Sequence, residues 1–228
     1  MSTGNYNEIT AKLYTDIGLF TSDKNAGSDA SALFNQLTGY SDPPNWYMFN
    51  TAPTGLRKKI TELIRNEIKL SSPDKPGRII IKINSLVNSE IIRLLYKASC
   101  SGVKVDLVIR GICCLRPGIK GVSENIKVTS IVDRYLEHSR IFYFYNDGRE
   151  DIYLSSADLM ERNLDRRVEL MFPVNDADLK NSLKSILDVY LRDNVKAREL
   201  KADGHYVKIN RRGKKPIHSQ EYFHEFHV

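Results

Sequence analysis

The sequence has 228 residues, 41% of them hydrophobic, and its 34 Lys and Arg residues against 28 Asp and Glu give a formal net charge of +6. The length and the hydrophobic content suffice for one or two packed domains. The positive net charge favours anionic partners, without indicating which kind. There is no apolar run of membrane-spanning length, no secretory signal and no zinc or disulfide spacing among the three cysteines, so we expect a cytoplasmic protein.

A linker near the N-terminus divides the chain. The segment 39–46, GYSDPPNW, places two prolines among Ser, Asp and Asn, a composition typical of turns. We therefore predict a domain boundary near residue 41. Residues 1–40 would end a preceding domain, residues 41–200 would form one α/β domain, and residues 201–228 would be a weakly patterned basic tail.

The α/β domain starts with a helix and then a strand, a helix and a strand. Residues 56–68 carry apolar side chains at helical spacing, and residues 78–84 are β-branched and apolar almost throughout, as in strands buried on both faces. A helix capped by Asn88 and ended by Gly102 leads to a similar strand at 104–109. Such a unit predicts a right-handed crossover and parallel pairing.

Apolar runs and helical periodicity predict the other elements. Together they indicate an α/β fold with a mixed, largely parallel sheet flanked by helices. We expect helices at residues 28–37 and 176–192, and further strands at 126–132, 140–145, 151–156 and 168–174.

Arg110 directly follows the second strand of the strand–helix–strand unit. Ligands of open α/β sheets bind at the carboxyl ends of parallel strands, and a guanidinium can bind phosphate oxygens in bidentate fashion. An arginine at a strand end is also often only a partner in a surface ion pair. The pattern alone leaves both interpretations open.

Residues 136–144, LEHSRIFYF, look like one strand, on which His138 and Arg140 would share a face. A neutral imidazole can attack phosphorus or transfer a proton, and a neighbouring cation can neutralise the oxygens of a phosphoryl group. The alternative is a strand whose polar start simply meets water.

The stretch 155–169, SSADLMERNLDRRVE, is rich in groups that bind or orient phosphate ligands. Ser155 or Ser156 can bind phosphate, and Asn163 or Glu169 can orient a histidine, although such clusters also make ordinary turns. The basic residues of this stretch can line a path for a polyanion or form a solvated loop: they are Arg162, Arg166 and Arg167.

Taken together, these segments resemble a known family. HSR followed by SSAD, Asn163 and RRVE is similar to a degenerate half of the phospholipase D-like motif, in which His-x-Lys precedes Gly-Ser-x-Asn and a later Glu. The segments STGNYNEITAKLYTD, VIRGICCLRPG, IVDRYLEHSRIFYF and YLSSADLMERNLDRRVEL resemble the C-terminal region of type 1 polyphosphate kinases over most of residues 2–200. The resemblance implies a phospholipase D-like α/β sandwich, with two such halves facing each other across the site.

The same resemblance implies an activity and site residues. The activity is reversible transfer of the γ-phosphoryl group of ATP to inorganic polyphosphate, through a phosphohistidine and with Mg²⁺. Tyr14 resembles the nucleotide-contacting tyrosine, Arg110 the phosphate-binding arginine and His138 the histidine of the second half, with Arg140 as its neighbouring cation.

One departure from the family pattern concerns the phosphorylated histidine, which the family carries in a His-x-Lys motif upstream of a stretch like STGN. The present chain starts at that stretch, and its other histidines, His205, His218, His224 and His227, lie in the tail. The Mg²⁺ ligands are likewise expected upstream. We therefore expect a C-terminal fragment that has no kinase activity on its own. The sequence leaves open whether the full-length enzyme forms a homo-oligomer.

Two other classes of function stay open as well. A phosphodiesterase or nuclease of the phospholipase D type would carry Lys in place of Arg140 and Gly-Ser-x-Asn in place of SSAD, so both substitutions count against it. A non-catalytic module that binds polyanions would need only the positive charge. No recognition-helix or aromatic RNA-binding motif predicts a specific nucleic-acid partner.

Overall fold

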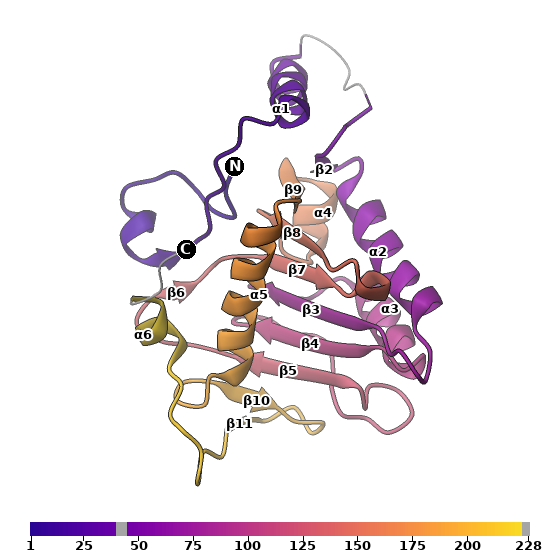
Figure 1. Ribbon diagram of the computed structural model, residues 1–228, viewed down its shortest axis with the longest axis vertical. Helices are drawn as coiled ribbons and strands as arrows, with labels where there is room; N and C mark the ends of the chain where they lie inside the picture. The colour runs from indigo at the N-terminus through magenta and orange to yellow at the C-terminus, as the bar shows by residue number, and fades with distance from the viewer. Residues whose placement is uncertain (40–44, 225–228) are drawn as a thin grey trace.

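The computed structural model describes residues 1–39 and 45–224, and in these residues a nine-stranded sheet lies between two layers of helices (Figure 1). A separate parallel pair joins β1 (Tyr14–Thr15) to β6 (Leu136–Glu137) beside one end of this sheet. In spatial order the nine strands are β11 (Tyr206–Lys208), β10 (Arg198–Leu200), β5 (Ile126–Ser130), β4 (Lys104–Ile109), β3 (Arg78–Ile83), β7 (Ile141–Phe144), β8 (Asp151–Ser155), β9 (Glu169–Val174) and β2 (Asn50–Ala52).

The sheet is mixed, as predicted, but the predicted share of parallel pairing was too high. β3 pairs with β4 and β4 with β5 in parallel, which confirms the expected crossover unit. The other pairs among the described strands of this sheet are antiparallel. The connection from β7 to β8 spans only residues 145–150 and contains the single turn η2 (Asn146–Gly148), which is too short for the crossover that a parallel pair requires.

Helices cover both faces of the sheet because β3 is apolar on both sides. Ile79, Ile81 and Ile83 pack in the cluster that contains α2 (Leu56–Leu70) and α3 (Ser89–Cys100), whereas Ile80 packs in the cluster that contains α5 (Ala177–Arg192). Burying one such side chain contributes about 1.5–3 kcal/mol. The predicted cap of α3 is confirmed, because the Asn88 side chain accepts a hydrogen bond from the Ile91 N–H (3.1 Å).

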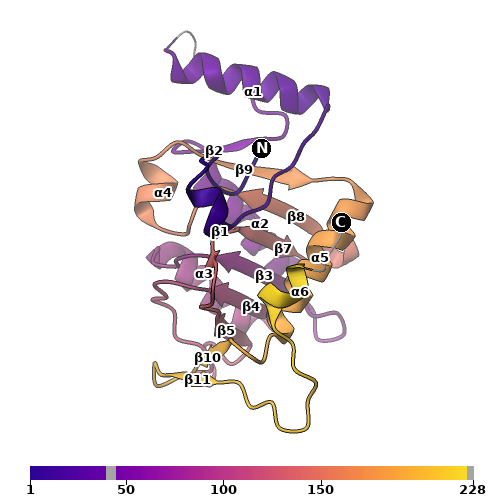
Figure 2. The same ribbon diagram turned by 90° about the vertical axis from the view of Figure 1, so that its left-hand side faces the viewer.

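The N-terminal residues form a separate lobe beside and above the sheet. They contain the short turn η1 (Thr10–Lys12), β1 and then α1 (Lys24–Leu37), which Figure 2 shows lying apart from the sheet. Helix α1 begins four residues before the predicted start because Asp23 caps it, accepting from the N–H groups of Asn25 (2.7 Å) and Ala26 (3.2 Å). The predicted boundary near residue 41 lies outside the described residues.

Residues 136–144 form two strands instead of the single strand expected. Strand β6 ends at Glu137 and pairs with β1, whereas β7 begins at Ile141 and pairs with β3 and β8. Residues 138–140 connect the two without regular structure. The chain passes from one sheet to the other here, so His138 and Arg140 lie on a connecting segment just before β7, an interior strand of the main sheet.

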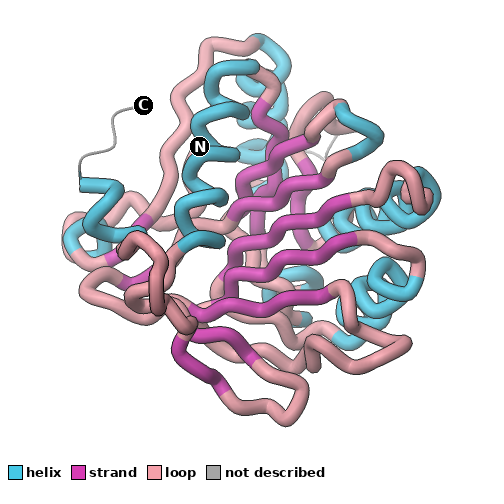
Figure 3. The backbone as a smooth tube through the Cα atoms, turned by 60° about the horizontal axis from the view of Figure 1, so that its bottom comes forward, coloured by secondary structure: helices cyan, strands magenta, loops and turns pink. Residues whose placement is uncertain are grey.

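The residues after 194 are more ordered than their weak pattern predicted. β10 and β11 extend the sheet at the edge that Figure 3 shows curling away, and α6 (Ser219–His224) packs beside α5. The Asp193 carboxylate organises this region by accepting from the N–H groups of residues 195–197 and of Ser219. Such side-chain to backbone bonds leave no periodic pattern in a sequence.

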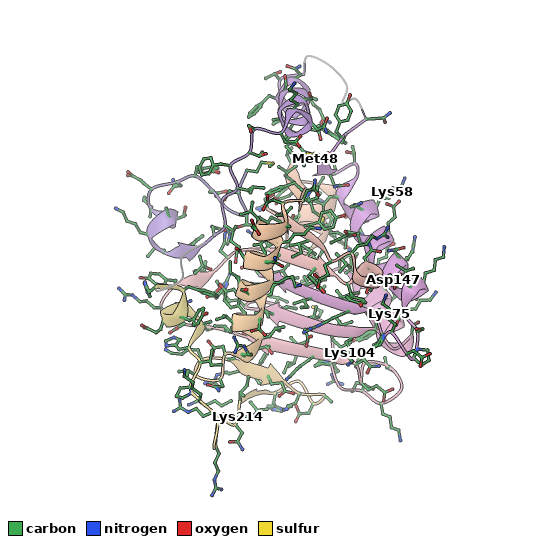
Figure 4. The ribbon with its side chains drawn as sticks, viewed as in Figure 1. Met48, Lys58, Lys75, Lys104, Asp147 and Lys214 are labelled. Carbon is green, nitrogen blue, oxygen red and sulfur yellow. The ribbon has the colours of Figure 1, made fainter. Side chains whose placement is uncertain are left out.

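The surface far from β6 carries ordinary exposed charges. Lys75 and Asp147 form an ion pair at the amino end of β3 (Figure 4), and both side chains are about half exposed. In the described part of the chain no helix has the length and apolar character needed to cross a membrane.

One ion pair lies inside the protein, between the sheet and α5. Lys82 Nζ on β3 contacts Glu137 Oε2 on β6 at 3.0 Å, and both side chains are 2% exposed. Lys82 Nζ also donates to the Ser139 hydroxyl (2.9 Å) and lies 4.6 Å from the centre of the Tyr190 ring. Burial lowers the pKa of Lys82, and the neighbouring Glu137 opposes this shift. The pair therefore joins β3 to the segment that carries His138.

We predict that Lys82→Met lowers the free energy of unfolding by about 3–5 kcal/mol, because it leaves the Glu137 carboxylate buried without its cation. The double variant Lys82→Met with Glu137→Gln should recover most of this loss, since it removes the buried charge. Lys58→Met is the matched control, because Lys58 is 80% exposed. Urea denaturation measures all three, and a single-variant loss below about 1 kcal/mol would contradict a stabilising buried pair.

Candidate functional site

The carboxyl ends of β3 and β4 open into a polar pocket of about 320 Å³ next to β6. The N-terminal segment and the residues after β8 complete its wall, so parts distant in the sequence meet here. The lining residues are Thr3, Gly4, Asn5, Tyr14, Asn84, Ser85, Arg110, Leu136, His138, Arg140, Ser156, Asp158, Arg162, Asn163, Arg167 and Glu169.

The His138 imidazole is held in one orientation by Asp16. Its Nδ1 lies 3.0 Å from Asp16 Oδ1 and 2.9 Å from Oδ2, and the Tyr14 ring packs against it with 4.8 Å between ring centres. A carboxylate on Nδ1 selects the tautomer that carries its proton there, which leaves Nε2 as the nitrogen for chemistry. A side chain on Gly4 would overlap the Asp16 carboxylate, so this approach requires glycine in the STGN stretch.

Arg110 is oriented by a backbone carbonyl of the segment that precedes His138. Its Nε donates to the Glu137 carbonyl oxygen (3.1 Å). The Asn84 amide, in the orientation that satisfies both of its ends, donates to the same oxygen (2.6 Å) and accepts from Arg140 Nη2 (2.8 Å). Arg110 is partly exposed and lines the pocket. The Glu137 peptide therefore sets the direction of the Arg110 guanidinium.

Arg140 lies in the pocket wall, but other protein groups accept most of its hydrogen bonds. Nε and Nη2 donate to the two carboxylate oxygens of Asp158 (3.4 and 3.2 Å), and Nη1 donates to the Thr3 carbonyl (2.8 Å). Nη1 also lies 3.4 Å from His138 Nδ1. His138 and Arg140 are thus adjacent, as predicted, although they do not share the face of a strand. The hydrogen bonds of Arg140 to Asp158 and Thr3 hold these parts of the pocket wall together.

Glu169 is the centre of a second group on the opposite wall. It accepts from the Ser156 hydroxyl (2.5 Å) and from Asn163 Nδ2 (2.6 Å). The Asn163 side chain is buried, and its carbonyl oxygen has no hydrogen-bond partner among the described residues. The carboxylate on Nδ1 of His138 is Asp16, so the predicted role of Glu169 or Asn163, which was to orient an unspecified histidine, does not concern His138. Their predicted role toward a histidine from elsewhere stays a prediction.

Two predicted residues do not line this pocket. The Ser155 hydroxyl donates to the Leu170 carbonyl (2.9 Å) and accepts from the Ala157 N–H (3.0 Å), so it fastens β8 to β9. Arg166 is exposed at the end of α4 (Glu161–Asp165), whereas Arg162 and Arg167 reach the lining. The basic part of the pocket therefore includes two of the three arginines of that stretch.

Sequence reasoning missed the two carboxylates that hold the pocket together. Asp16 follows Tyr14 by two positions, a spacing that in an extended segment places both side chains on one face, and this signal was available. Asp158 accepts from the N–H groups of Asn84 (2.8 Å) and Ser85 (3.2 Å) as well as from Arg140. The contacts of Asp158 with Asn84 and Ser85 join residues more than 70 positions apart, which no local pattern indicates.

Arginines outnumber carboxylates in the lining, so the pocket suits an anion. Both lining carboxylates, Asp158 and Glu169, already accept hydrogen bonds from protein donors. Within residues 1–39 and 45–224, no three His, Cys, Asp or Glu side chains come together in a way that could hold a metal ion.

We expect Asp158→Asn to destabilise the protein by about 3–5 kcal/mol, because it leaves the buried Arg140 guanidinium without its counter-ion. The matched control is Asp165→Asn, which breaks an arginine pair with Arg57 at the surface and should cost at most about 1 kcal/mol. Equal losses for the two variants, measured by chemical denaturation, would refute the role given to Asp158.

Two family models cover nearly the whole chain. Residues 49–220 match the model described as polyphosphate kinase C-terminal domain 2, and residues 1–43 match polyphosphate kinase C-terminal domain 1. Among curated relatives, the polyphosphate kinase of an Exiguobacterium species is 52% identical over 227 residues, which are 99% of this chain and 32% of that protein. The Lactiplantibacillus plantarum enzyme is 50% identical over 223 residues, 98% of this chain and 31% of that protein.

Solved structures give the same result. The crystal structure of polyphosphate kinase from Porphyromonas gingivalis matches 99% of this chain and 35% of its own with a TM-score of 0.94 and 40% identity. Nuc from Salmonella typhimurium, a phospholipase D family member, matches 67% of this chain and 96% of its own with a TM-score of 0.50 and 14% identity, a likeness of fold alone. The chain spans about a third of the length of the curated relatives. It belongs to the polyphosphate kinase family, whose C-terminal domains it matches, and it has the phospholipase D-like fold.

Proposed function

We propose that the pocket binds the phosphate groups of ATP and of inorganic polyphosphate, and that it forms one half of a phosphoryl-transfer site. The observation that supports this most is the convergence of His138, oriented by Asp16, and Arg110, oriented by the Glu137 carbonyl, on one cationic pocket. Phosphoryl transfer requires mainly positioning and electrostatic stabilisation, which preorganised donors of this kind supply.

In this proposal the γ-phosphoryl group moves from ATP to a histidine outside the present chain and then to the end of a polyphosphate. In the first step the bond between the γ-phosphorus and its bridging oxygen breaks, and a bond from the histidine nitrogen to phosphorus forms, which releases ADP. In the second step a terminal polyphosphate oxygen replaces the histidine. In both steps His138 donates a hydrogen bond from Nε2 to the phosphoryl oxygens when both of its ring nitrogens carry a proton, with the Nδ1 proton directed at Asp16, and Arg110 neutralises the charge that develops there.

The Glu169 group would serve the histidine that receives the phosphoryl group. The Asn163 carbonyl oxygen, which is buried and unpaired among the described residues, has the right character to accept an N–H from an incoming imidazole. Glu169 orients Asn163 through its amide nitrogen. The prediction that Asn163 or Glu169 orients a histidine therefore applies best to a histidine supplied from outside this chain.

The remaining lining residues fit the two ends of the substrate. Tyr14 packs at a tilt against His138 and offers its ring to a nucleotide base, while Arg162 and Arg167 extend the cationic surface toward a long polyanion. Mg²⁺, when bound to the nucleotide phosphates, neutralises their charge; we expect its protein ligands outside this chain. Cytoplasmic location and homo-oligomer formation likewise stay predictions.

Transfer activity is tested with a chimera in which this chain replaces the matching 227 residues of the Exiguobacterium enzyme. We predict that the chimera makes polyphosphate from ATP and that His138→Ala lowers its rate by about a hundred- to a thousandfold, the usual loss for one preorganised donor. His205→Ala is the control, because His205 is an exposed histidine in the turn between β10 and β11. A His138→Ala rate within about threefold of the parent would refute the proposed role.

Binding is tested with the 228-residue chain alone, by calorimetric titration with tripolyphosphate. Arg110→Gln should weaken binding by about ten- to a hundredfold, because it removes charge-assisted hydrogen bonds to phosphate. Arg166→Gln changes the net charge equally but lies outside the pocket, so its affinity should stay within about twofold of the parent chain. Equal weakening by the two variants, removed equally by added salt, would instead indicate nonspecific attraction of a polyanion.

A further inference from the structure

Gln220 reaches the back of the phosphate pocket from the other end of the chain. It lies on α6, is 5% exposed, and is not among the residues that line the pocket. Its Oε1 accepts from the Tyr135 N–H (2.9 Å), and its Nε2 donates to the Tyr135 carbonyl (2.9 Å). The carboxamide thus pairs with the backbone just before β6 as a neighbouring strand would.

The same side chain also binds Glu137, whose carbonyl orients Arg110 and which directly precedes His138. Gln220 Nε2 lies 2.7 Å from Glu137 Oε1, while the other carboxylate oxygen contacts Lys82 and accepts from the Thr15 hydroxyl (3.1 Å). The Glu137 carbonyl orients Arg110, and the next residue is His138. Gln220 therefore supplies the hydrogen-bond donor for Oε1 of the buried Glu137 carboxylate, and the backbone carbonyl of the same residue accepts from the pocket residue Arg110.

The docking of α6 does not depend on Gln220. The Ser219 N–H and hydroxyl both donate to Asp193 Oδ2 (2.8 and 2.7 Å). Asn194 bonds the backbone of Ile217, and the Phe223 ring lies 5.0 Å from that of Tyr190. Because these contacts hold α6 in place, the three hydrogen bonds of Gln220 are not needed to dock the helix. Their effect falls on the segment 135–138.

We propose that Gln220 is a positioning residue for the phosphate pocket, and this inference rests on the proposed function. It acts through Glu137 on the direction of Arg110, and through Tyr135 on the placement of β6 and His138. Without it, the Tyr135 backbone groups and Glu137 Oε1 lose their partner, and β6 keeps its short pairing with β1 and the contact of Glu137 with Lys82. The donors then spread over several orientations, and a misplacement of about 1 Å is enough to cost up to about a hundredfold in rate.

The test compares Gln220→Ala with Glu221→Ala, which alters the next, exposed residue of the same helix. Gln220→Met is a second variant that keeps the side-chain volume and removes all three hydrogen bonds. For each chain we would measure the thermal midpoint, the amide exchange of residues 135–138, the His138 imidazole resonances and the affinity for tripolyphosphate.

We expect both Gln220 variants to exchange these amides faster, to shift the His138 resonances and to bind tripolyphosphate about ten- to a hundredfold more weakly, at temperatures where they remain folded. Glu221→Ala should match the parent chain. A folded Gln220 variant with parental affinity and unchanged His138 resonances would overturn the inference and leave the proposed function intact. Failure of the parent chain itself to bind tripolyphosphate would overturn the proposed function, whatever the exchange data show.

Discussion

The ion pair between Lys82 and Glu137 is the contact on which the rest of the site depends. Two buried charges are costly unless each is fully satisfied, and here every oxygen of Glu137 has a protein partner. Those partners come from β3, β1 and α6, and the Glu137 carbonyl accepts from Arg110. The need to satisfy one buried carboxylate therefore brings four distant parts of the chain together at the carboxyl ends of the parallel strands.

This arrangement explains how a pocket made of short segments can be rigid. The strands β1 and β6 have only two residues each and could not stay paired alone, but β6 is held on its far side by Gln220 and beneath by Lys82. On the other wall, Asp158 fastens Arg140 to the end of β3. The pocket donors Arg110 and His138 are thus held in place by neighbouring protein groups, which is the preorganisation that the proposed phosphoryl transfer would require.

Much of the fold was predictable because its elements are strongly periodic. The helices and the strands of the crossover unit lie within a few residues of their predicted places. The antiparallel pairing in the sheet and the C-terminal elements were not predicted, because long-range pairing and not local pattern decides them. The pocket was anticipated through motif resemblance, but its internal partners were not. Nine predicted residues line it: Tyr14, Arg110, His138, Arg140, Ser156, Arg162, Asn163, Arg167 and Glu169. The roles of Asp158 and Glu137 follow only from contacts between distant segments, whereas the spacing of Asp16 from Tyr14 could have indicated that Asp16 lies at the site.

The most direct measurement is a crystal structure of this chain with tripolyphosphate. The account predicts phosphate oxygens within hydrogen-bond distance of the Arg110 guanidinium and of His138 Nε2, with the Lys82 to Glu137 contact and the Glu137 carbonyl bond to Arg110 unchanged. Phosphates bound only to the exposed arginines Arg162, Arg166 and Arg167, or an Arg110 side chain that leaves the Glu137 carbonyl to reach its ligand, would contradict it.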